Sequence, residues 1–115
     1  MASYNKVILI GNLTANPQIK YNPGGLAVTN FTLAVNTRYS TKEQGTKEEV
    51  GFFDVVVFGR QAETCANYLS KGRTALVDGR LAWNKWEAKD GTTRTKVYIV
   101  ANKIQFVSER NRNFI

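Results

Sequence analysis

Several aromatic side chains in this sequence stand beside a cation. Arg38 precedes Tyr39, and Lys85 precedes Trp86. An aromatic face can stack on a flat unsaturated ring, and a neighbouring Lys or Arg can neutralise an anion. A ligand that carries both flat rings and phosphates would use both kinds of contact, and a nucleic acid is such a ligand.

Catalytic and metal-binding side chains are scarce. The chain has no histidine and a single cysteine, Cys65, so a zinc site of Cys and His and the His-based nucleophile systems are excluded. The acidic residues Asp54, Glu63, Asp78 and Glu87 are scattered, and no two of them are spaced as a catalytic or magnesium-binding pair. We therefore expect no enzyme activity, no metal site and no cofactor.

The net charge of the chain favours a polyanionic partner. The 115 residues correspond to one domain and carry 16 Lys and Arg against 9 Asp and Glu, a formal charge of +7. The usual partners of such an excess are nucleic acids or acidic membrane surfaces, and a merely solvated basic surface is the alternative. The chain has neither an apolar run of about 18 residues nor the plan of a signal peptide. We expect a cytosolic protein that is not associated with a membrane.

Period-two alternation predicts five strands, and one stretch has the helical period instead. The predicted strands are Val7–Leu13, Ala27–Tyr39, Phe52–Phe58, Ala75–Trp86 and Thr93–Val107. The helix is predicted from the apolar residues Ala62, Cys65, Ala66 and Leu69, which share one helical face.

The order of these elements predicts the fold class. The polar residues 40–49 predict a long mobile loop, and Asp90-Gly91 predicts a hairpin turn. One short helix lies between the third and fourth strands, and a long hairpin joins the fourth and fifth. This order predicts an all-β OB-fold, a five-stranded Greek-key barrel of a kind that binds oligonucleotides.

Strand parity sorts the aromatic residues into core and surface. An aspartate is costly to bury without a partner, so the face of Asp54 is the outward one in its strand, and it also carries Phe52 and Phe58. The inward residues of the third predicted strand are then Phe53, Val55 and Val57. Those of the fourth are Ala75, Val77, Gly79 and Leu81. Trp83 shares the inward parity but lies where its strand leaves the barrel, so core packing and nucleic-acid contact both stay open.

Outward aromatics interleaved with cations predict a single-stranded ligand. Duplex DNA hides the faces of its bases, and no helix here carries the basic face that groove reading needs. The expected stacking residues are Tyr39, Phe52, Phe58, Trp86 and Trp83. The expected phosphate contacts are Arg38, Lys71, Arg73, Arg80, Lys85, Lys89 and Arg94.

The first strand is apolar on both faces, which predicts that something covers it on both sides. Leu76 points outward in its own strand and is a second apolar candidate for the same contact. The residues expected at a contact between subunits are Asn5, Lys6, Val7, Ile8, Leu9, Ile10 and Leu76.

The ordered motifs of the chain resemble those of the bacterial single-stranded DNA-binding proteins. They follow the same order and spacing as in that family from about residue 5 to residue 107. The matching residues and segments are Asn5–Leu13, Pro17, Tyr21, Gly24–Val28, Phe31–Ala34, Val55–Glu63, Tyr68–Gly72, Gly79–Leu81, Lys85-Trp86, Asp90-Gly91 and Lys103–Val107. The resemblance implies an OB-fold homotetramer that binds and protects single-stranded DNA, without sequence preference, in replication, recombination and repair. An RNA-binding or primosome-type OB module is the alternative.

The resemblance also carries residue roles and two departures. It assigns stacking to Tyr39 and Phe52, where the family has tryptophan, and to Phe58 and Trp86, which match in type. Ala82 and Asn84 stand where the family has basic residues in the outgoing fourth strand. Family members usually end in an acidic tip that recruits replication and repair proteins, whereas this sequence ends in a basic stretch, so such recruitment does not carry over. Residues 1–108 are expected to form the binding domain and residues 109–115 a disordered end, in a core fragment or a tailless paralogue.

Overall fold

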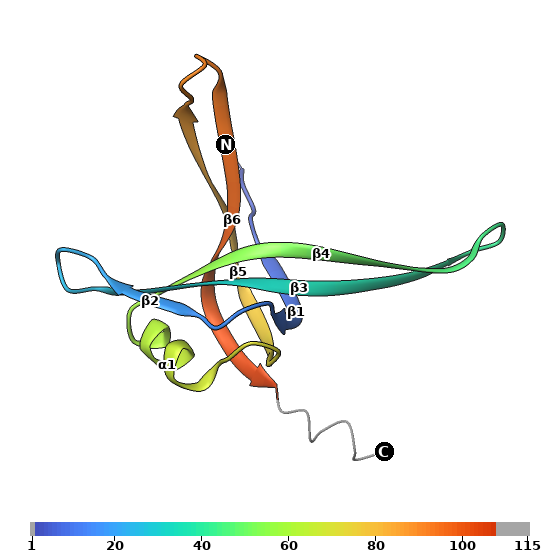
Figure 1. Cartoon of the computed structure of the whole chain (residues 1–115), viewed down its shortest axis with the longest axis horizontal. Coiled ribbons are helices and arrows are strands. Elements are labelled where there is room, and N and C mark those ends of the chain that lie inside the picture. Colours follow the sequence, from blue (N-terminus) through green and yellow to red (C-terminus); the bar gives the residue numbers. More distant parts are fainter. Residues whose placement is uncertain (1, 108–115) are drawn as a thin grey trace.

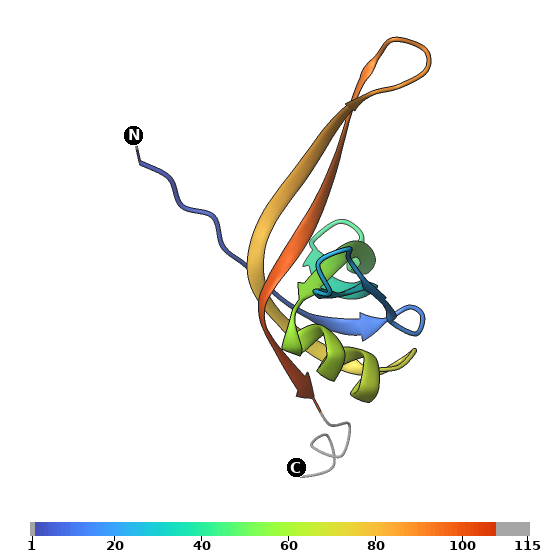
Figure 2. The same ribbon diagram turned by 90° about the vertical axis from the view of Figure 1, so that its left-hand side faces the viewer.

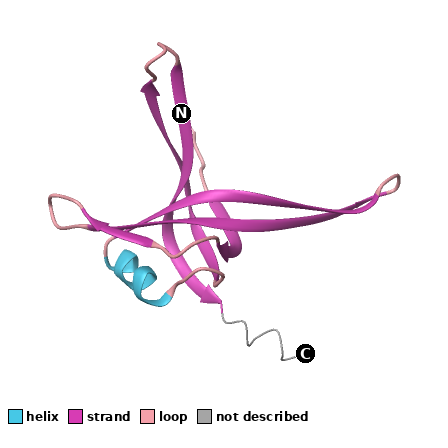
Figure 3. Ribbon diagram, viewed as in Figure 1, coloured by secondary structure: helices cyan, strands magenta, loops and turns pink. Residues whose placement is uncertain are grey.

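The computed structural model describes residues 2–107, and it consists almost entirely of long strands around one short helix (Figures 1 and 3). The elements in chain order are β1 Val7–Leu13, β2 Gln18–Tyr21, β3 Ala27–Thr41, β4 Gly45–Phe58, α1 Arg60–Tyr68, β5 Thr74–Glu87 and β6 Thr93–Val107. All five predicted strands and the helix are present. The expected end at residues 109–115 lies outside the described residues.

Five of the strands close into a barrel. The sheet order is β1-β5-β6-β4-β3-β2, and an additional β1–β3 pairing closes the ring while β2 lies on the outer edge of β3. The pairs are antiparallel except β4 with β6, which meet in parallel at Val55↔Ile99 and Val56↔Val100. The predicted five-stranded OB-fold barrel is thus confirmed, with the helix between its third and fourth strands and a long hairpin between its fourth and fifth.

The barrel core comes from the inward parity of each strand, and α1 covers one end of it. Leu33, Val55, Val57, Val77 and Ile99 are fully buried there, together with the helix residues Ala62 and Cys65. The hydroxyl of Thr29, also fully buried, donates a hydrogen bond to the Ala62 carbonyl at 2.7 Å. This bond fastens the helix to β3 and satisfies the only polar side chain among the buried residues described.

Two hairpins leave the barrel as arms (Figures 1 and 2). The β3–β4 arm extends to one side, and the β5–β6 arm rises on the side opposite α1. The long loop predicted over residues 40–49 is wrong in extent, because β3 runs to Thr41 and β4 begins at Gly45. Backbone pairing needs no apolar side chains, so a fully polar ribbon can continue the ladder, and Gly45 at φ 71° makes the tight turn.

Four exposed residues form β2, which the sequence pattern did not predict. Such a short edge strand has no buried face and hence no alternation. Among residues 2–107 no helix has the length and apolar character needed to cross a membrane.

Candidate nucleic-acid interface

Two exposed phenylalanines share one outer face of the β3–β4 ladder. Phe52 and Phe58 are 66% and 43% exposed, and Asp54 lies between them on the same side of β4. Residues directly opposite in an antiparallel pair lie on one face, so Thr32, the partner of Asp54, belongs to this face as well. Val55 and Val57, of the other parity, are buried. Strand alternation therefore predicted the exposure of both phenylalanines correctly.

A cleft of about 460 Å³ lies beside this face, between the barrel wall and the foot of the β5–β6 arm. Its lining comes from the β1–β2 connection, the first residue of β2, β3, β4 and both strands of the arm. Most of its lining residues have polar side chains: Thr14, Asn16, Gln18, Asn30, Thr32, Asp54, Asn84, Lys96 and Tyr98. In an OB-fold the outer face of these central strands, together with the loops at its ends, is where oligonucleotides bind.

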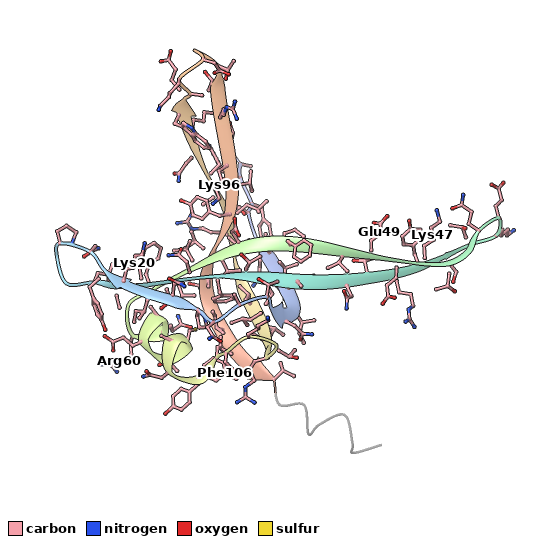
Figure 4. All side chains as sticks on the ribbon, in the orientation of Figure 1. Lys20, Lys47, Glu49, Arg60, Lys96 and Phe106 are labelled. Carbon is pink, nitrogen blue, oxygen red and sulfur yellow. The ribbon has the colours of Figure 1, made fainter. Side chains whose placement is uncertain are left out.

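An ion pair crosses the cleft from the barrel to the arm. The Nζ of Lys96 on β6 lies 3.4 Å from Oδ2 of Asp54 on β4, and both side chains are about half exposed. The other carboxylate oxygen of Asp54 accepts a hydrogen bond from the Thr32 hydroxyl at 2.9 Å. Lys96 lies where β6 leaves the barrel (Figure 4).

The same face of the arm continues outward from Lys96 to Trp86. Trp86 is paired with Arg94, and Asn84 with Lys96, so these four side chains lie on one side of the ribbon. Arg94 forms an ion pair with Asp90 at the tip, 3.5 Å apart. The hydroxyl and N–H of Thr92 donate to Asp90 and, with Arg94, lower the pKa of its carboxyl. An aromatic face and two cations thus extend the cleft along the arm.

Trp83 and Lys85 lie on the reverse side of the arm. Trp83 is paired with Val97, and Lys85 with Thr95. Val97 and Thr95 lie on the side of β6 that, further along the strand, carries the buried Ile99. Trp83 is nevertheless 60% exposed, because at this point of β5 the arm extends beyond the barrel core. Adjacency in the sequence predicts that Lys85 and Trp86 act together, whereas the alternation of the strand places them on opposite sides of the arm.

Tyr39 and Arg38 lie on opposite sides of the β3–β4 arm. Arg38 belongs to the side of Phe52 and forms an ion pair with Glu48 at 3.7 Å. Tyr39 belongs to the other side, where its hydroxyl donates to a carboxylate oxygen of Glu49 at 3.0 Å. Tyr39 is therefore not part of the face that carries the two phenylalanines.

The remaining predicted cations are dispersed. The backbone N–H of Lys71 donates to the side chain of Asn16, a cleft residue, whereas Arg73 lines a separate small pocket beside Tyr68. Arg80 lines a second cleft, against the N-terminal segment. Lys89 is exposed in the turn at the tip of the β5–β6 arm. These four cations do not converge on the cleft.

An apolar strip lies on the outer face of β1 and β5. Ile8 and Ile10 are exposed, and Leu76 is partly exposed directly opposite Ile10. Val7 and Leu9, of the other parity, pack against the barrel core. The Lys6–Asp78 ion pair, at 3.6 Å, borders the strip at one end.

The Asn5 side chain bonds within its own chain. Its amide nitrogen donates to the Leu81 carbonyl and its oxygen accepts from the Leu81 N–H, both at 2.8 Å. This pairing holds the N-terminal segment against β5 just before β1 begins.

None of the residues that line the cleft was among the predicted site residues, and Lys96 and Tyr98 on β6 are the most consequential omissions. The signal that could have found them is the register of the β5–β6 hairpin, because residues of β6 that pair with Asn84 and Ala82 must share the side of Trp86.

Cys65 takes no part in the cleft, because it is buried under the helix. Burial raises the pKa of its thiol to about 11. Among residues 2–107 there is no group of three or more acidic or cysteine side chains that could hold a metal ion.

Comparisons with known proteins agree on one family. The sequence model of the "Single-strand binding protein family" matches residues 4–107. "Single-stranded DNA-binding protein 3" of Clostridium acetobutylicum is 47% identical over 110 residues, which is 95% of this chain and 74% of that protein.

Two solved structures match the fold. The Plasmodium falciparum SSB in complex with ssDNA is 27% identical, with a TM-score of 0.85 over 94% of this chain and 98% of that chain. The wild-type single-stranded DNA-binding protein from Thermus aquaticus is 39% identical, with a TM-score of 0.80 over 94% of this chain. The present chain spans 52% of the length of that protein.

Proposed function

The chain belongs to the single-strand binding protein family, and from that premise we propose that it binds and protects single-stranded DNA without sequence preference and without catalysing a reaction. The observation that carries the proposal is the continuous surface formed by Phe52 and Phe58, the cleft beside them, and the face of the β5–β6 arm with Lys96, Arg94 and Trp86. Aromatic platforms beside cations bind the bases and the backbone of a single strand.

The main strand path runs over the outer face of β4, through the cleft and along the arm. Bases stack on Phe52, Phe58 and Trp86, while Lys96 and Arg94 contact phosphates. Each stacked base contributes roughly 1–3 kcal/mol, and because every base has a flat face the binding tolerates any sequence. The polar side chains of the cleft give this path hydrogen-bonding groups for base edges.

The other predicted residues bind the strand where it leaves this path. Tyr39 and Arg38 act on the β3–β4 arm, and Trp83 and Lys85 act on the reverse side of the β5–β6 arm. The four dispersed cations Lys71, Arg73, Arg80 and Lys89 contact phosphates as the strand passes round the barrel. Their spread over several surfaces supports a strand that wraps the protein.

The protein acts as a homotetramer, and the apolar strip of Ile8, Ile10 and Leu76 forms one of its contacts. Exposed isoleucines on a regular strand, opposite a leucine on the neighbouring strand, make a flat apolar surface that a second copy would cover. The other residues of the predicted contact, Asn5, Lys6, Val7 and Leu9, support this strip from within the chain. Sedimentation of the purified protein tests the assembly.

In the cell, the protein serves replication, recombination and repair in the bacterial cytoplasm, at the nucleoid. Residues 1–108 form the DNA-binding unit.

Tryptophan fluorescence tests the binding function. Oligo-dT is expected to quench the emission of Trp86, and a Trp86→Phe variant identifies the share that belongs to this residue. Competition of poly-U against poly-dT distinguishes the alternative of an RNA-binding module, which predicts that RNA displaces DNA. Binding of neither polymer at low salt would reject the proposed function.

A further inference from the structure

A carboxylate lies in the middle of the surface assigned to a polyanion. Asp54 stands between Phe52 and Phe58 on β4 and lines the cleft. A negative charge here repels phosphates unless a cation neutralises it, and Lys96 does so from the facing arm at 3.4 Å. The pair therefore joins the two walls between which a strand would have to pass.

The two ends of this ion pair are held differently. Oδ1 of Asp54 accepts the Thr32 hydroxyl at 2.9 Å, so Asp54 keeps a hydrogen bond from its own wall of the cleft when Lys96 leaves. Lys96 has a long flexible stem on the ribbon of β6 and is more than half exposed. The cation can thus change partner at little cost, while the carboxylate stays in place.

We propose that Lys96 is a phosphate-binding residue of the cleft and that Asp54 competes with DNA for it. In the free protein Lys96 is paired with Asp54, and in the complex it is paired with a phosphate. Asp54 thereby lowers the affinity of the protein for single strands, because each binding event must first break the ion pair. This inference rests on the proposed function and specifies how one of its cations is regulated.

A second explanation of Asp54 makes the opposite prediction. If Lys96 stayed with Asp54 in the complex, its role would be to mask the carboxylate from the phosphates. Removing Lys96 would then expose Asp54, and neutralising Asp54 would help binding more in the absence of Lys96 than in its presence. Under the exchange that we propose, neutralising Asp54 helps mainly when Lys96 is there to be released.

A double-mutant cycle separates the two explanations. The variants are Asp54→Asn, Lys96→Ala and both together, with binding to a fluorescein-labelled oligo-dT measured at one fixed salt concentration. We expect D54N to bind about two- to fivefold more tightly, the range that a half-exposed ion pair supports. K96A should bind more weakly and reduce the slope of log affinity against log salt by about 0.7, one phosphate contact on a single strand.

The decisive quantity is the gain from D54N in each background. A smaller gain in K96A than in the wild-type protein supports the exchange, and an equal or larger gain overturns it. Lys96→Arg should restore both the affinity and the salt slope, because it keeps the cation. Failure of K96R to restore them, with the fold intact by circular dichroism, also counts against Lys96 as a phosphate ligand.

The chain offers a charge control in Glu63. It is exposed in the first turn of α1, on the side of the barrel opposite the β5–β6 arm, and it lines neither the cleft nor the outer strip of β1 and β5. Glu63→Gln removes the same charge and should leave the affinity unchanged. A gain equal to that of D54N would show that only net charge matters and would overturn the inference. If the wild-type protein does not bind oligo-dT at all, the proposed function fails and not merely this exchange.

Discussion

Replacing Phe52 by alanine should separate DNA binding from folding. Phe52 is 66% exposed, so only about a third of its side chain contributes to the folded state. Full burial of a phenylalanine contributes about 1.5–3 kcal/mol, so the loss of unfolding free energy should be about 0.5–1 kcal/mol. The loss of one stacked base should cost about 1–3 kcal/mol of binding free energy, which is about 5- to 150-fold in affinity.

Two titrations on the same preparation measure these quantities. Urea unfolding gives the stability, and fluorescence anisotropy of a labelled oligo-dT gives the affinity. Tyr68→Ala is the matched control, because Tyr68 is 65% exposed but lies on α1, on the other side of the barrel from the β5–β6 arm (Figure 1). Equal affinity losses for the two variants, or no loss for F52A, would refute the stacking role of the outer face of β4.

Three further changes test the fold, the assembly and the buried thiol. Thr29→Val removes the buried hydroxyl that bonds to the Ala62 carbonyl, and the unfolding free energy in urea should fall by about 1–3 kcal/mol; an unchanged midpoint would show that this bond does not fasten the helix. Ile10→Asp places a charge on the outer strip of β1, and sedimentation should detect a smaller assembly than that of the wild-type protein, whereas an unchanged mass would exclude this strip from the contact. Burial raises the pKa of Cys65 from 9.0 to about 11, so the folded state favours the neutral thiol; its contribution to stability is complete below pH 9 and is lost as the pH rises toward 11. Ellman's reagent should accordingly leave Cys65 unmodified in the native protein at pH 8 and modify it in urea, and rapid modification of the native protein would contradict its burial.

Strand parity was enough to predict the barrel and much of its outer face. The alternation around Asp54 separates Val55 and Val57, which are buried, from Phe52 and Phe58, which are exposed. The pattern works here because both sides of each strand have distinct surroundings, one the core and the other solvent.

Strand parity fails to predict burial at the edge of the barrel core. Phe53 and Leu81 have inward parity but are 38% and 41% exposed, whereas Ala82 of the outward set is buried. Phe53 and Leu81 are paired with the fully buried Leu33 and Ile99, so they lie at the edge of the core and not beyond it, and the β5–β6 ladder has a register shift between Asp78 and Gly79. A bulge and the end of the core are tertiary features that leave no mark on local periodicity.

The site residues that the sequence could not bring together depend on contacts between distant strands. Asp54 and Lys96 are 42 positions apart, and nothing in the sequence of either strand indicates the other as its partner. Only the closure of the barrel through β4 and β6 brings them to 3.4 Å. Likewise, Lys85 precedes Trp86 in sequence, but the strand turns them to opposite sides of the arm.

The measurement that tests the central proposal most directly is a titration of the wild-type protein with oligo-dT across a series of salt concentrations, followed by tryptophan fluorescence. We expect strong quenching at low salt and a linear fall of log affinity with log salt, with a slope of about −0.7 for each phosphate contacted. The absence of quenching even at low salt would contradict the proposal that this chain binds single-stranded DNA.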